Sequence, residues 1–582
     1  MKNIDISEIL RQKSPALFSN YPSFVSKGLV NFLDLLFHTR QINHVLKEFA
    51  AEKNFDFIDS LFNYLDFSYE LSKEDKLRIP AEGKLVVVAN HPLGGLDGLA
   101  LLRALGEVRS DVKVVANDVL SHIENIRDLL LPYDVLSVSA QRKNLERIEA
   151  SLAADEAILF FPAAEVSRLG WSGVQDRKWL KGAVKYASKL NAPVLPVYVD
   201  GQNSALFYLL SLLYRRFGMF LLPHELFNKK GESLKLHAGN PIPASAFTRS
   251  GLNERHLTNL LKKHVYRIGA GKPGIFHTET TIIRPTPKEL LVNDLSRSEL
   301  LGQTADGKKI YLCAHDSAPN VLREISRLRE ITFRSVGEGA GKEADSDKYD
   351  RYYDHIALWD DRLQEIMGSY RLCLVRDVIE NKGVAGLYNA SMFAFGPDFN
   401  PIFDQAIELG RSFIQQKYWK SSALDYIWQG IGAYIQKRPN VKYLLGAVSV
   451  SDSYTTYAKN LIVYYYKKWY GIELNGVKSL TPYVISAKEE RDLSSIFAGK
   501  SRQEDFNALK SALKELGFTV PALYRKYVEL CEYGGANFID FAVNVNFMNS
   551  LDGLLLLDLT RMRETSRHRY FGQRSFLDPS RN

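Results

Sequence analysis

NHPLGGLDG, at residues 90–98, follows the branched apolar run KLVVVA at residues 84–89, and together they predict a buried strand that ends in a polar turn. Pro92 ends the strand because it has no N–H for the ladder. Gly94 and Gly95 permit a turn with positive φ that folds Asp97 back beneath the ring of His91. Open α/β sheets bind their ligands at the carboxyl ends of strands, so this turn is the first candidate site.

The pair formed by His91 and Asp97 allows two interpretations. An imidazole that is held by a carboxylate through one nitrogen can accept a proton at the other, which makes the pair a proton relay. The alternative is structural: His91 packs in a strand-to-helix turn, and Asp97 caps the helix that follows. We favour the relay, and the sequence leaves both interpretations open.

The length and composition predict two globular domains. A chain of 582 residues exceeds a single core, and 46% hydrophobic with 24% charged residues excludes large-scale disorder. The formal charge of +8 is modest for this length and indicates a basic face. Such a face suits an anionic membrane surface or an acidic carrier protein, and we expect no nucleic-acid partner.

The cysteines and the N-terminal sequence indicate a reducing compartment. Cys313, Cys373 and Cys531 are far apart and show no CxxC spacing, which argues against a zinc site and against a disulfide framework. We also expect no signal peptide and no membrane-spanning helix, because no apolar run is long enough. The predicted location is cytoplasmic, peripheral at the inner face of the cytoplasmic membrane.

The pattern of apolar runs predicts a helical segment followed by two α/β domains. The segment covers residues 1–75, and its helix at residues 21–37 suits either a membrane interface or the protein core. The first domain, residues 76–290, alternates strands with helices, which predicts a mostly parallel sheet with helices on both faces. The second domain, residues 300–582, repeats this alternation. The predicted strands lie at residues 84–89, 112–116, 157–161, 193–199 and 234–238, and at residues 309–314, 370–376, 383–389 and 443–448.

Three irregular stretches interrupt this pattern. Residues 205–222 (ALFYLLSLLYRRFGMFLL) are strongly apolar, but the double arginine disfavours a bilayer span, so we expect either an interfacial or tunnel-lining helical hairpin or a plain buried helix. RPTP at residues 284–287 predicts a linker between the domains. The polar, glycine-rich residues 337–348 predict a mobile loop.

Two further blocks of the first domain follow strands. FPAAEVSR, at residues 161–168, offers the carboxylate of Glu165 and the guanidinium of Arg168, and APVLPV, at residues 192–197, is a strand punctuated by prolines. In this order the three blocks resemble the glycerophosphate and lysophospholipid acyltransferases, whose pattern is N-H-x4-D, then F-P-E-G, then V-P-V-x-P-V. The resemblance covers residues 75–245.

This resemblance implies a role for each matching residue. His91 would be the general base that takes a proton from the acceptor hydroxyl, Asp97 would orient it, and Asn90, Glu165 and Arg168 would lie in the substrate-binding blocks. The sequence departs from the pattern in its H-x5-D spacing and in FPAAE, and both variants are similar to the haemolysin-labelled and ornithine-lipid branch of the family.

Two further side chains, and one missing motif, bear on the first domain's chemistry. Asn117 and Arg142 are additional candidates for acceptor contacts, although for each a surface role explains the sequence equally well. No G-x-S-x-G nucleophile elbow is present, so we expect the acceptor hydroxyl to attack the thioester directly.

The second domain carries its own candidate site in AIELGRSFI, at residues 406–414, followed by Tyr418 and Trp419. A strand with Glu408 and Arg411 that leads into a helix can present backbone N–H groups to a thioester. The alternative is that Glu408 and Arg411 form a solvated ion pair with no role in binding. This stretch, with LREITFR at residues 328–334, resembles the GNAT-type N-acyltransferases of ornithine-lipid synthesis, which are related to the acyl-homoserine-lactone synthases. The resemblance covers residues 300–575.

The second resemblance implies that Glu408 is a base or an amine-positioning group and that Arg411 binds donor or substrate. The usual pyrophosphate loop, Q/R-x-x-G-x-G/A, does not follow Arg411. An acyl carrier protein therefore suits the site as donor partner, with acyl-CoA as the other source, and we expect no tightly bound cofactor and no metal.

Together the two resemblances imply a bifunctional acyltransferase that makes an amino-acid-containing membrane lipid. The second domain would N-acylate a free amino acid, ornithine by the resemblance, with a 3-hydroxyacyl chain, and the first would then esterify that hydroxyl. One alternative is a lysophospholipid acyltransferase with a non-catalytic second domain. The other, which we rank last, is a membrane-active haemolysin.

Overall fold

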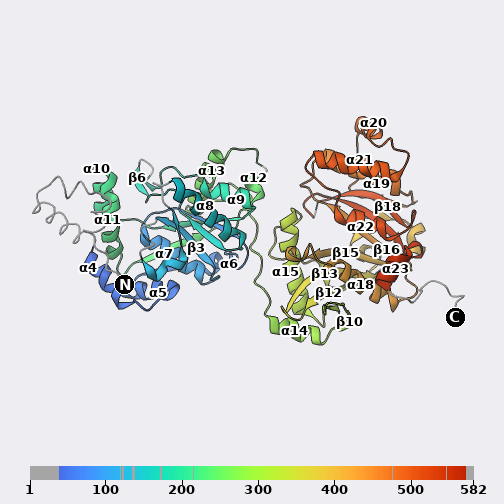
Figure 1. Cartoon of the computed structure of the whole chain (residues 1–582), viewed down its shortest axis with the longest axis horizontal. Coiled ribbons are helices and arrows are strands. Elements are labelled where there is room, and N and C mark those ends of the chain that lie inside the picture. The colour runs from blue at the N-terminus through green and yellow to red at the C-terminus, as the bar shows by residue number, and fades with distance from the viewer. Residues whose placement is uncertain are drawn as a thin grey trace, which may run out of the picture. The chain divides into compact units, whose positions relative to one another are not determined.

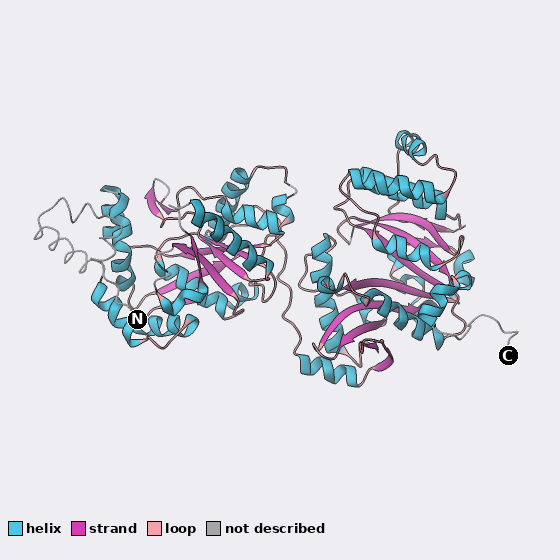
Figure 2. Ribbon diagram, viewed as in Figure 1, coloured by secondary structure: helices cyan, strands magenta, loops and turns pink. Residues whose placement is uncertain are grey.

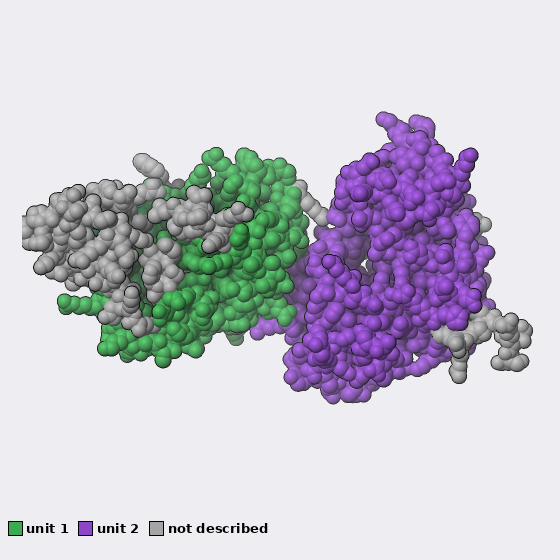
Figure 3. All heavy atoms as spheres, viewed as in Figure 1, with its two compact units in different colours: residues 1–281 green, residues 282–582 purple. Residues whose placement is uncertain are grey.

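The structure of the protein is a computed structural model with two compact units, residues 1–281 and residues 282–582 (Figure 3). It describes residues 38–571 apart from 118–119, 121–122, 134–137, 171–172, 214, 249, 475 and 546, and it leaves out the side chains of residues 138–143 and 212–220. The helix predicted at residues 21–37 and the side chain of Arg142 therefore lie outside the described part.

The described part of the first unit contains a seven-stranded sheet in the order β1-β9-β8-β2-β5-β3-β4 (Figure 1). Every neighbouring pair is parallel except β8 with β9. The strands are β1 (Ser68–Leu71), β2 (Leu85–Ala89), β3 (Val112–Asn117), β4 (Leu130–Tyr133), β5 (Ala157–Phe160), β8 (Val194–Asp200) and β9 (Ser233–Ala238), with the small hairpin β6 (Arg168–Gly170) and β7 (Gly173–Gln175) apart from the sheet.

Helices cover both faces of this sheet because its central strands are apolar on both sides. Leu85 and Val87 of β2 pack with α5 and α7 in one core, and Val86 and Val88 pack with α8, α9 and α13 in the other. The described helices are α4 (Thr39–Glu48), α5 (Asn54–Tyr64), α6 (Lys73–Leu77), α7 (Gly95–Gly106), α8 (Val138–Ala153), α9 (Gly182–Leu190), α10 (Ala205–Leu213), α11 (Arg215–Asn228), α12 (Ser245–Thr248), α13 (Glu254–Gly269) and the 3-10 turn η2 (Glu124–Leu129). The predicted fold class of this half is confirmed.

The described part of the second unit is built on an eight-stranded sheet in the order β10-β11-β12-β13-β15-β16-β19-β18. Here every pair is antiparallel except β15 with β16. The strands are β10 (Glu299–Gln303), β11 (Lys309–Cys313), β12 (Asp354–Asp360), β13 (Glu365–Leu374), β15 (Ala406–Ile414), β16 (Tyr443–Val450), β18 (Ala536–Asn544) and β19 (Ser550–Asp558), with β14 (Phe393–Phe395) and β17 (Val477–Ser479) as a separate pair.

Helices again lie on both faces of the sheet (Figure 2). The amphipathic α15 packs with α14 on one face, and α18, α19, α21 and α22 bury the other face in the largest core. The helices are α14 (Lys288–Ser296), α15 (Pro319–Val336), α16 (Val375–Lys382), α17 (Asn400–Phe403), α18 (Ala423–Gln436), α19 (Thr456–Tyr470), α20 (Ala487–Ile496), α21 (Arg502–Glu515), α22 (Ala522–Leu530) and α23 (Glu564–Phe571), with 3-10 turns η3 (Lys348–Arg351), η4 (Val384–Gly386), η5 (Asn389–Ser391), η6 (Pro397–Phe399), η7 (Gln416–Tyr418) and η8 (Leu559–Arg561). This arrangement fits the predicted GNAT-like domain.

The local expectations can be compared with the structure one by one, and the clearest differences are the N-terminal segment and the strand at residues 383–389. Residues 38–75 are part of the first unit, since β1 pairs with β9 and extends the sheet. The strand expected at residues 383–389 is instead the pair of turns η4 and η5, because Gly383 has φ +70° and Leu387 is buried in a local aromatic core. Residues 205–213 and 215–222 belong to α10 and α11, and no described helix is long and apolar enough to cross a bilayer. The three cysteines are buried and free.

Candidate active sites

The first candidate site lies where β2 ends and α7 begins. Nδ1 of His91 is 3.1 Å from Oδ1 of Asp97. Nδ1 is fully enclosed, while the imidazole side chain as a whole keeps 19% of its surface exposed. The nitrogen that remains for a substrate hydroxyl is therefore Nε2. The ring of Phe161 packs on the imidazole with the two centroids 4.2 Å apart, which fixes the ring plane.

Asp97 takes part in both interpretations that the sequence left open. Its second oxygen, Oδ2, accepts hydrogen bonds from the backbone N–H groups of Leu93 (2.9 Å) and Gly94 (3.3 Å), so the carboxylate caps the start of α7. The turn depends on Gly94, whose φ is +93°, whereas Gly95 already belongs to the helix. The helix cap thus holds the other oxygen, Oδ1, against the imidazole.

A second carboxylate, Asp176, ties the first two sequence blocks together. Its Oδ1 accepts hydrogen bonds from the His91 backbone N–H (3.2 Å) and from the Ser167 hydroxyl (2.5 Å), and its Oδ2 accepts one from Trp179 Nε1 (2.8 Å). The Ser167 N–H also donates to the His91 carbonyl at 2.7 Å. No sequence motif pointed to Asp176, since it lies outside the three blocks.

The electrostatics of this site favour a basic imidazole. Burial lowers the pKa of His91, but the charges of Asp97 and Asp176 outweigh burial, so the pKa lies above its ordinary value. A raised pKa makes the neutral imidazole a stronger base toward a hydroxyl proton. The pair can therefore carry out general-base catalysis once His91 is deprotonated.

The block at residues 161–168 follows β5 and turns beside His91. Ala164 has φ +56°, and it occupies the position at which the F-P-E-G pattern has glycine. Glu165 is half-buried, and Arg168 is buried at the start of β6, with its guanidinium 5.6 Å from the centroid of the Phe207 ring on α10. These two side chains stay candidates for substrate binding.

The remaining predicted residues of this unit lie in different settings. The Asn90 amide is buried and exchanges two hydrogen bonds with the backbone of Val199 (2.7 and 2.9 Å), which ties the ends of β2 and β8 together. Asn117 is the exposed last residue of β3. These hydrogen bonds give Asn90 a structural role, because its amide group is engaged with the Val199 backbone.

The second candidate site gathers around β15. Both oxygens of Glu408 are occupied: Oε2 accepts hydrogen bonds from the Tyr353 hydroxyl and the Tyr388 N–H (3.0 Å), and Oε1 accepts one from the Asn389 N–H (2.8 Å). The residue is 1% exposed, and burial raises the pKa of its carboxyl. These contacts suit the positioning role predicted for Glu408 better than a direct role as base.

Arg411 belongs to a buried network of arginines and aspartates that the sequence did not predict as a whole. Its Nη1 lies 2.9 Å from Asp345 Oδ1, and Nη1 of Arg371 lies 2.6 Å from Asp347 and 2.9 Å from Asp350. The network has these members: Arg329 of α15, Asp345 and Asp347 of the following loop, Asp350 of η3, His355 of β12, Arg371 of β13 and Arg411 of β15. The loop expected to be mobile thus supplies two of the carboxylates.

Some polar groups of this network and of the adjacent Asn389 have no hydrogen-bond partner among the described residues. Nε and Nη2 of Arg371, Nε of Arg411 and both amide atoms of Asn389 are buried without a hydrogen bond from any described residue. Buried polar groups are normally satisfied, so such a cluster marks a place for a polar ligand or for water. Tyr388 lies in its centre, with the guanidinium carbons of both arginines 5.3 Å from the centroid of its ring.

Two further carboxyl groups, those of Asp552 and Glu338, lie close enough to Arg411 to feel its charge. Asp552 is buried and accepts hydrogen bonds from Asn544 (2.8 Å) and Ser550 (2.9 Å). Burial and the nearby Asp552 raise the pKa of Glu338 to about 7, against the opposing charge of Arg411. A half-buried carboxyl group that titrates near neutral pH is suited to accept a proton from an amine.

The two central strands of the second unit separate next to this network. The parallel ladder between β15 and β16 covers only Ala406–Glu408 and Tyr443–Leu445, after which β15 follows β13 and β16 follows β19. Gly446 permits their close approach at the branch point, since a Cβ there would lie 2.6 Å from the Leu409 carbonyl oxygen. Such a split leaves backbone groups on both strands for an extended ligand such as a pantetheine arm.

Among the described residues, no three His, Cys, Asp or Glu side chains converge in a way that could hold a metal ion.

Comparisons with known proteins match the two halves separately. Residues 8–271 match the Acyltransferase family, and residues 328–429 match the Acetyltransferase (GNAT) domain. The chain is 33% identical over 302 residues to a glycine N(alpha)-acyltransferase of Bacteroides thetaiotaomicron, covering 50% of this chain and 89% of that protein. It is 31% identical over 255 residues to a lyso-glycine lipid O-acyltransferase of the same organism, covering 42% of this chain and 91% of that protein. An L-ornithine N(alpha)-acyltransferase of Rhizobium meliloti is 30% identical over 148 residues, covering 24% of this chain and 49% of that protein.

Proposed function

Since the chain belongs to the acyltransferases of amino-acid lipids, we propose that its two units carry out the two successive acyl transfers that build such a lipid. The second unit would form the amide bond of an N-acyl amino acid, and the first unit would add a second chain through an ester bond. The observation that carries this proposal is the presence of two separate candidate sites on one polypeptide: the His91–Asp97 pair, and the split strands with the arginine network.

The chemistry of the acceptor defines the acyl donor of the first step. Neither glycine nor ornithine carries a hydroxyl group, so an O-acyltransferase that follows N-acylation needs a hydroxyl on the acyl chain itself. We therefore propose a 3-hydroxyacyl thioester as donor for N-acylation. The alignment spans nearly the whole glycine enzyme but about half of the ornithine enzyme, so we place glycine before ornithine as the acceptor.

In the first step, the deprotonated amine attacks the thioester carbonyl, the C–N bond forms and the C–S bond breaks, and the thiol leaves. We assign the proton acceptor to Glu338, whose carboxyl group titrates near neutral pH, and a positioning role to Glu408. Arg411 would help to hold substrate. The split between β15 and β16 supports an extended pantetheine donor, from acyl carrier protein or from acyl-CoA.

In the second step, the 3-hydroxyl of the N-acyl amino acid attacks a second acyl thioester. Nε2 of His91 takes the hydroxyl proton as the C–O bond forms, and the imidazolium returns it to the departing thiolate. The charge of Asp97 stabilises that imidazolium through Nδ1. From the neighbouring block, Arg168 is assigned to the carboxylate of the acceptor. Glu165 is assigned to the part of the acceptor next to that carboxylate.

A peripheral membrane location would suit the one-chain intermediate, which is an amphiphile. Leu206 and Leu209 lie on one face of α10 and expose 52% and 58% of their surface, while Phe207 of the same helix is buried beside the first site. An exposed apolar face next to a lipid-acylating site is suited to contact with a bilayer surface.

Lipid analysis tests the proposal in cells. A host without amino-acid lipids that expresses this chain should contain a new two-chain glycine lipid, detected by mass spectrometry of the extract. Its His91→Ala variant should accumulate the one-chain intermediate. A two-chain lipid in the variant would contradict the role of His91, and a host with no new amino-acid lipid would contradict the proposal as a whole.

A further inference from the structure

A small apolar cavity lies where β15 and β16 separate, and two tyrosines, Tyr370 and Tyr527, form part of its wall. The cavity has a volume of about 20 Å³, which is close to the space that one water-sized group occupies. Its wall is formed by Tyr370, Leu409, Gly446 and Tyr527, together with aliphatic residues of β16 and β19. All of these side chains except the two tyrosines are aliphatic or absent, so the tyrosine hydroxyls are the polar side-chain groups of the wall.

Those hydroxyls are hydrogen-bonded to each other across the core. Tyr370 comes from β13 and Tyr527 from α22, and they are 3% and 5% exposed. Burial raises the pKa of both, so both keep their protons at neutral pH. The pair holds two hydroxyl protons, and the shared hydrogen bond uses one of them, while the Ser412 side chain is hydrogen-bonded to Tyr370 as well. A third oxygen that entered the cavity would therefore find both a donor and an acceptor.

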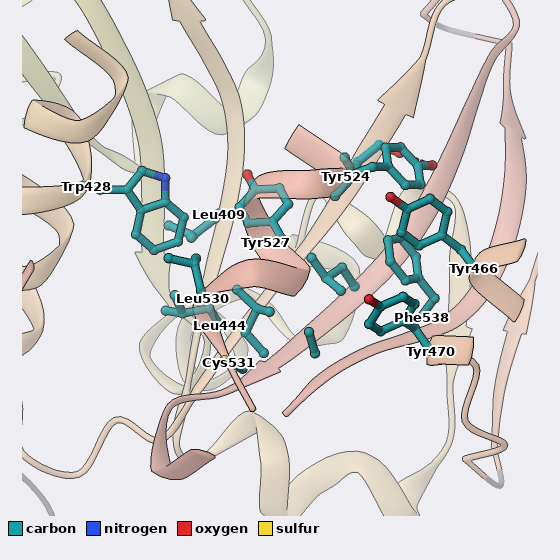
Figure 4. Close-up of a cluster of buried hydrophobic side chains, with 14 of the residues drawn as sticks. Leu409, Trp428, Leu444, Tyr466, Tyr470, Tyr524, Tyr527, Leu530, Cys531 and Phe538 are labelled. Carbon is teal, nitrogen blue, oxygen red and sulfur yellow. Dashed lines mark hydrogen bonds between the residues drawn. The ribbon is translucent and has the colours of Figure 1, made fainter. Parts of the chain in front are cut away.

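The neighbouring aromatic residues do not share this arrangement. Tyr524, one turn earlier on α22, already donates its hydroxyl to the Val448 carbonyl at 2.9 Å. Figure 4 shows Tyr524 with Tyr466 and Phe538 in one aromatic group, whereas the ring of Tyr527 lies apart from it, beside Leu409. Tyr527 thus lines the cavity at the split between the strands, whereas Tyr524 packs with Tyr466 and Phe538 in the core.

The chemistry of the donor supplies an oxygen of the right kind. A plain acyl thioester has no polar atom beyond its carbonyl, whereas a 3-hydroxyacyl thioester carries one hydroxyl two carbons farther on. With the thioester in the split, this hydroxyl is the group of the acyl chain that the water-sized cavity could receive, because the tyrosine pair lies in its otherwise apolar wall.

We propose that the paired hydroxyls of Tyr370 and Tyr527 form a subsite that binds the 3-hydroxyl of the acyl donor during N-acylation. This inference rests on the proposed function of the second unit. It gives the chain a means of selecting donors that carry the hydroxyl on which the first unit acts. Sites that hydrogen-bond a substrate hydroxyl discriminate strongly against analogues that lack it, because the buried partners are then left unpaired.

The test compares two donors that differ only in the 3-hydroxyl. The purified full-length chain is given glycine and either a 3-hydroxyacyl or a plain acyl thioester of the same length on the same carrier, and kcat/KM for N-acylglycine is measured for each. We expect the wild-type chain to prefer the 3-hydroxy donor by at least ~100-fold. Tyr527→Phe should reduce that ratio about tenfold, mainly by slowing the reaction of the 3-hydroxy donor.

Two further variants make the result specific. Tyr370→Phe should reduce the ratio in the same way, and it decides the question if Tyr527→Phe does not fold, as judged by circular dichroism. Tyr524→Phe is the matched control, because it removes a buried hydroxyl from the same helix and should leave the ratio unchanged.

The outcomes separate this inference from the function on which it rests. Activity with both donors and a ratio near one in the wild-type chain overturns the subsite, and so does a high ratio that neither tyrosine variant changes. A chain that forms no N-acylglycine from either donor overturns the proposed function together with the subsite.

Discussion

Replacing Asp97 by Asn separates the two functions of this side chain at the first site. The carboxylate caps α7 through Oδ2 and faces Nδ1 of His91 through Oδ1. An asparagine keeps one oxygen, which can still accept the N–H groups of Leu93 and Gly94. Its amide nitrogen then faces Nδ1 and donates to it, which holds the imidazole in the tautomer with its proton on Nε2.

The wrong tautomer removes the base while the fold is retained. General-base catalysis contributes roughly 10²–10⁴ in rate, and the loss of an orienting carboxylate falls at the upper end. We expect O-acylation to fall by about 10³-fold, which corresponds to ~4 kcal/mol in the activation free energy. Because the cap is retained, the free energy of unfolding should change by less than ~1 kcal/mol.

The assay measures both reactions of one preparation. O-acylation is followed with an N-(3-hydroxyacyl)glycine acceptor, and N-acylation by the second unit serves as the internal control for folding and concentration. Thermal unfolding of the wild-type and Asp97→Asn chains checks the cap. If Asp97→Asn keeps more than about one tenth of wild-type O-acylation, Asp97 is only a helix cap, and the proton relay is refuted.

Three further substitutions test the roles of Asp176, Glu338 and Ala164. Since the charges of Asp97 and Asp176 raise the pKa of His91, kcat/KM for O-acylation should rise with pH through that pKa. Asp176→Asn should move this rise to lower pH. An unmoved pH profile would argue that Asp176 only holds the loop. Glu338, with a pKa of about 7, should give N-acylation a rise near neutral pH that Glu338→Gln abolishes together with at least ~90% of the rate, and full activity of that variant would assign the base elsewhere. Its raised pKa also means that the ionised carboxylate is disfavoured in the folded state, so stability should fall as pH increases from the ordinary carboxyl range toward 7, by an amount that Glu338→Gln removes. Ala164→Gly should raise the free energy of unfolding by ~0.5–1 kcal/mol, because Ala164 has φ +56°. Chemical denaturation measures this free energy, and a lower value for the variant than for the wild-type chain would contradict that reasoning.

The first site could be predicted from sequence because its parts are local. His91 and Asp97 are six positions apart, and the strand, the turn and the helix that place them follow one another directly. A short apolar run and one glycine turn therefore specify the geometry. Asp176 could not be predicted in this way, since it reaches His91 from the end of a separate hairpin.

The second site depends on long-range pairing that no local pattern shows. Arg371 and Arg411 come from neighbouring strands, and their side chains meet because a β-bulge shifts the register between β13 and β15 near Arg411, which has φ +52°. Asp345 and Asp347 lie in a loop whose composition is typical of mobile segments. Only their ion pairs with buried arginines reveal that the loop is part of the site.

The misplaced strand has a similar cause. Residues 383–389 (GVAGLYN) have strand-like composition, but in the structure the N–H groups of Tyr388 and Asn389 donate hydrogen bonds to Glu408. Two consecutive 3-10 turns achieve this, and an extended strand would not. Tertiary contacts thus override the local preference.

A reconstituted reaction shows whether this one chain joins two acyl groups to one amino acid. The purified chain is incubated with isotopically labelled glycine, a 3-hydroxyacyl thioester and a plain acyl thioester, and the labelled products are followed over time by mass spectrometry. We expect labelled N-(3-hydroxyacyl)glycine to form first and then to be converted to a two-chain lipid with an ester at its 3-hydroxyl. Label that never enters a lipid, or a one-chain product that the chain does not convert, would contradict this expectation.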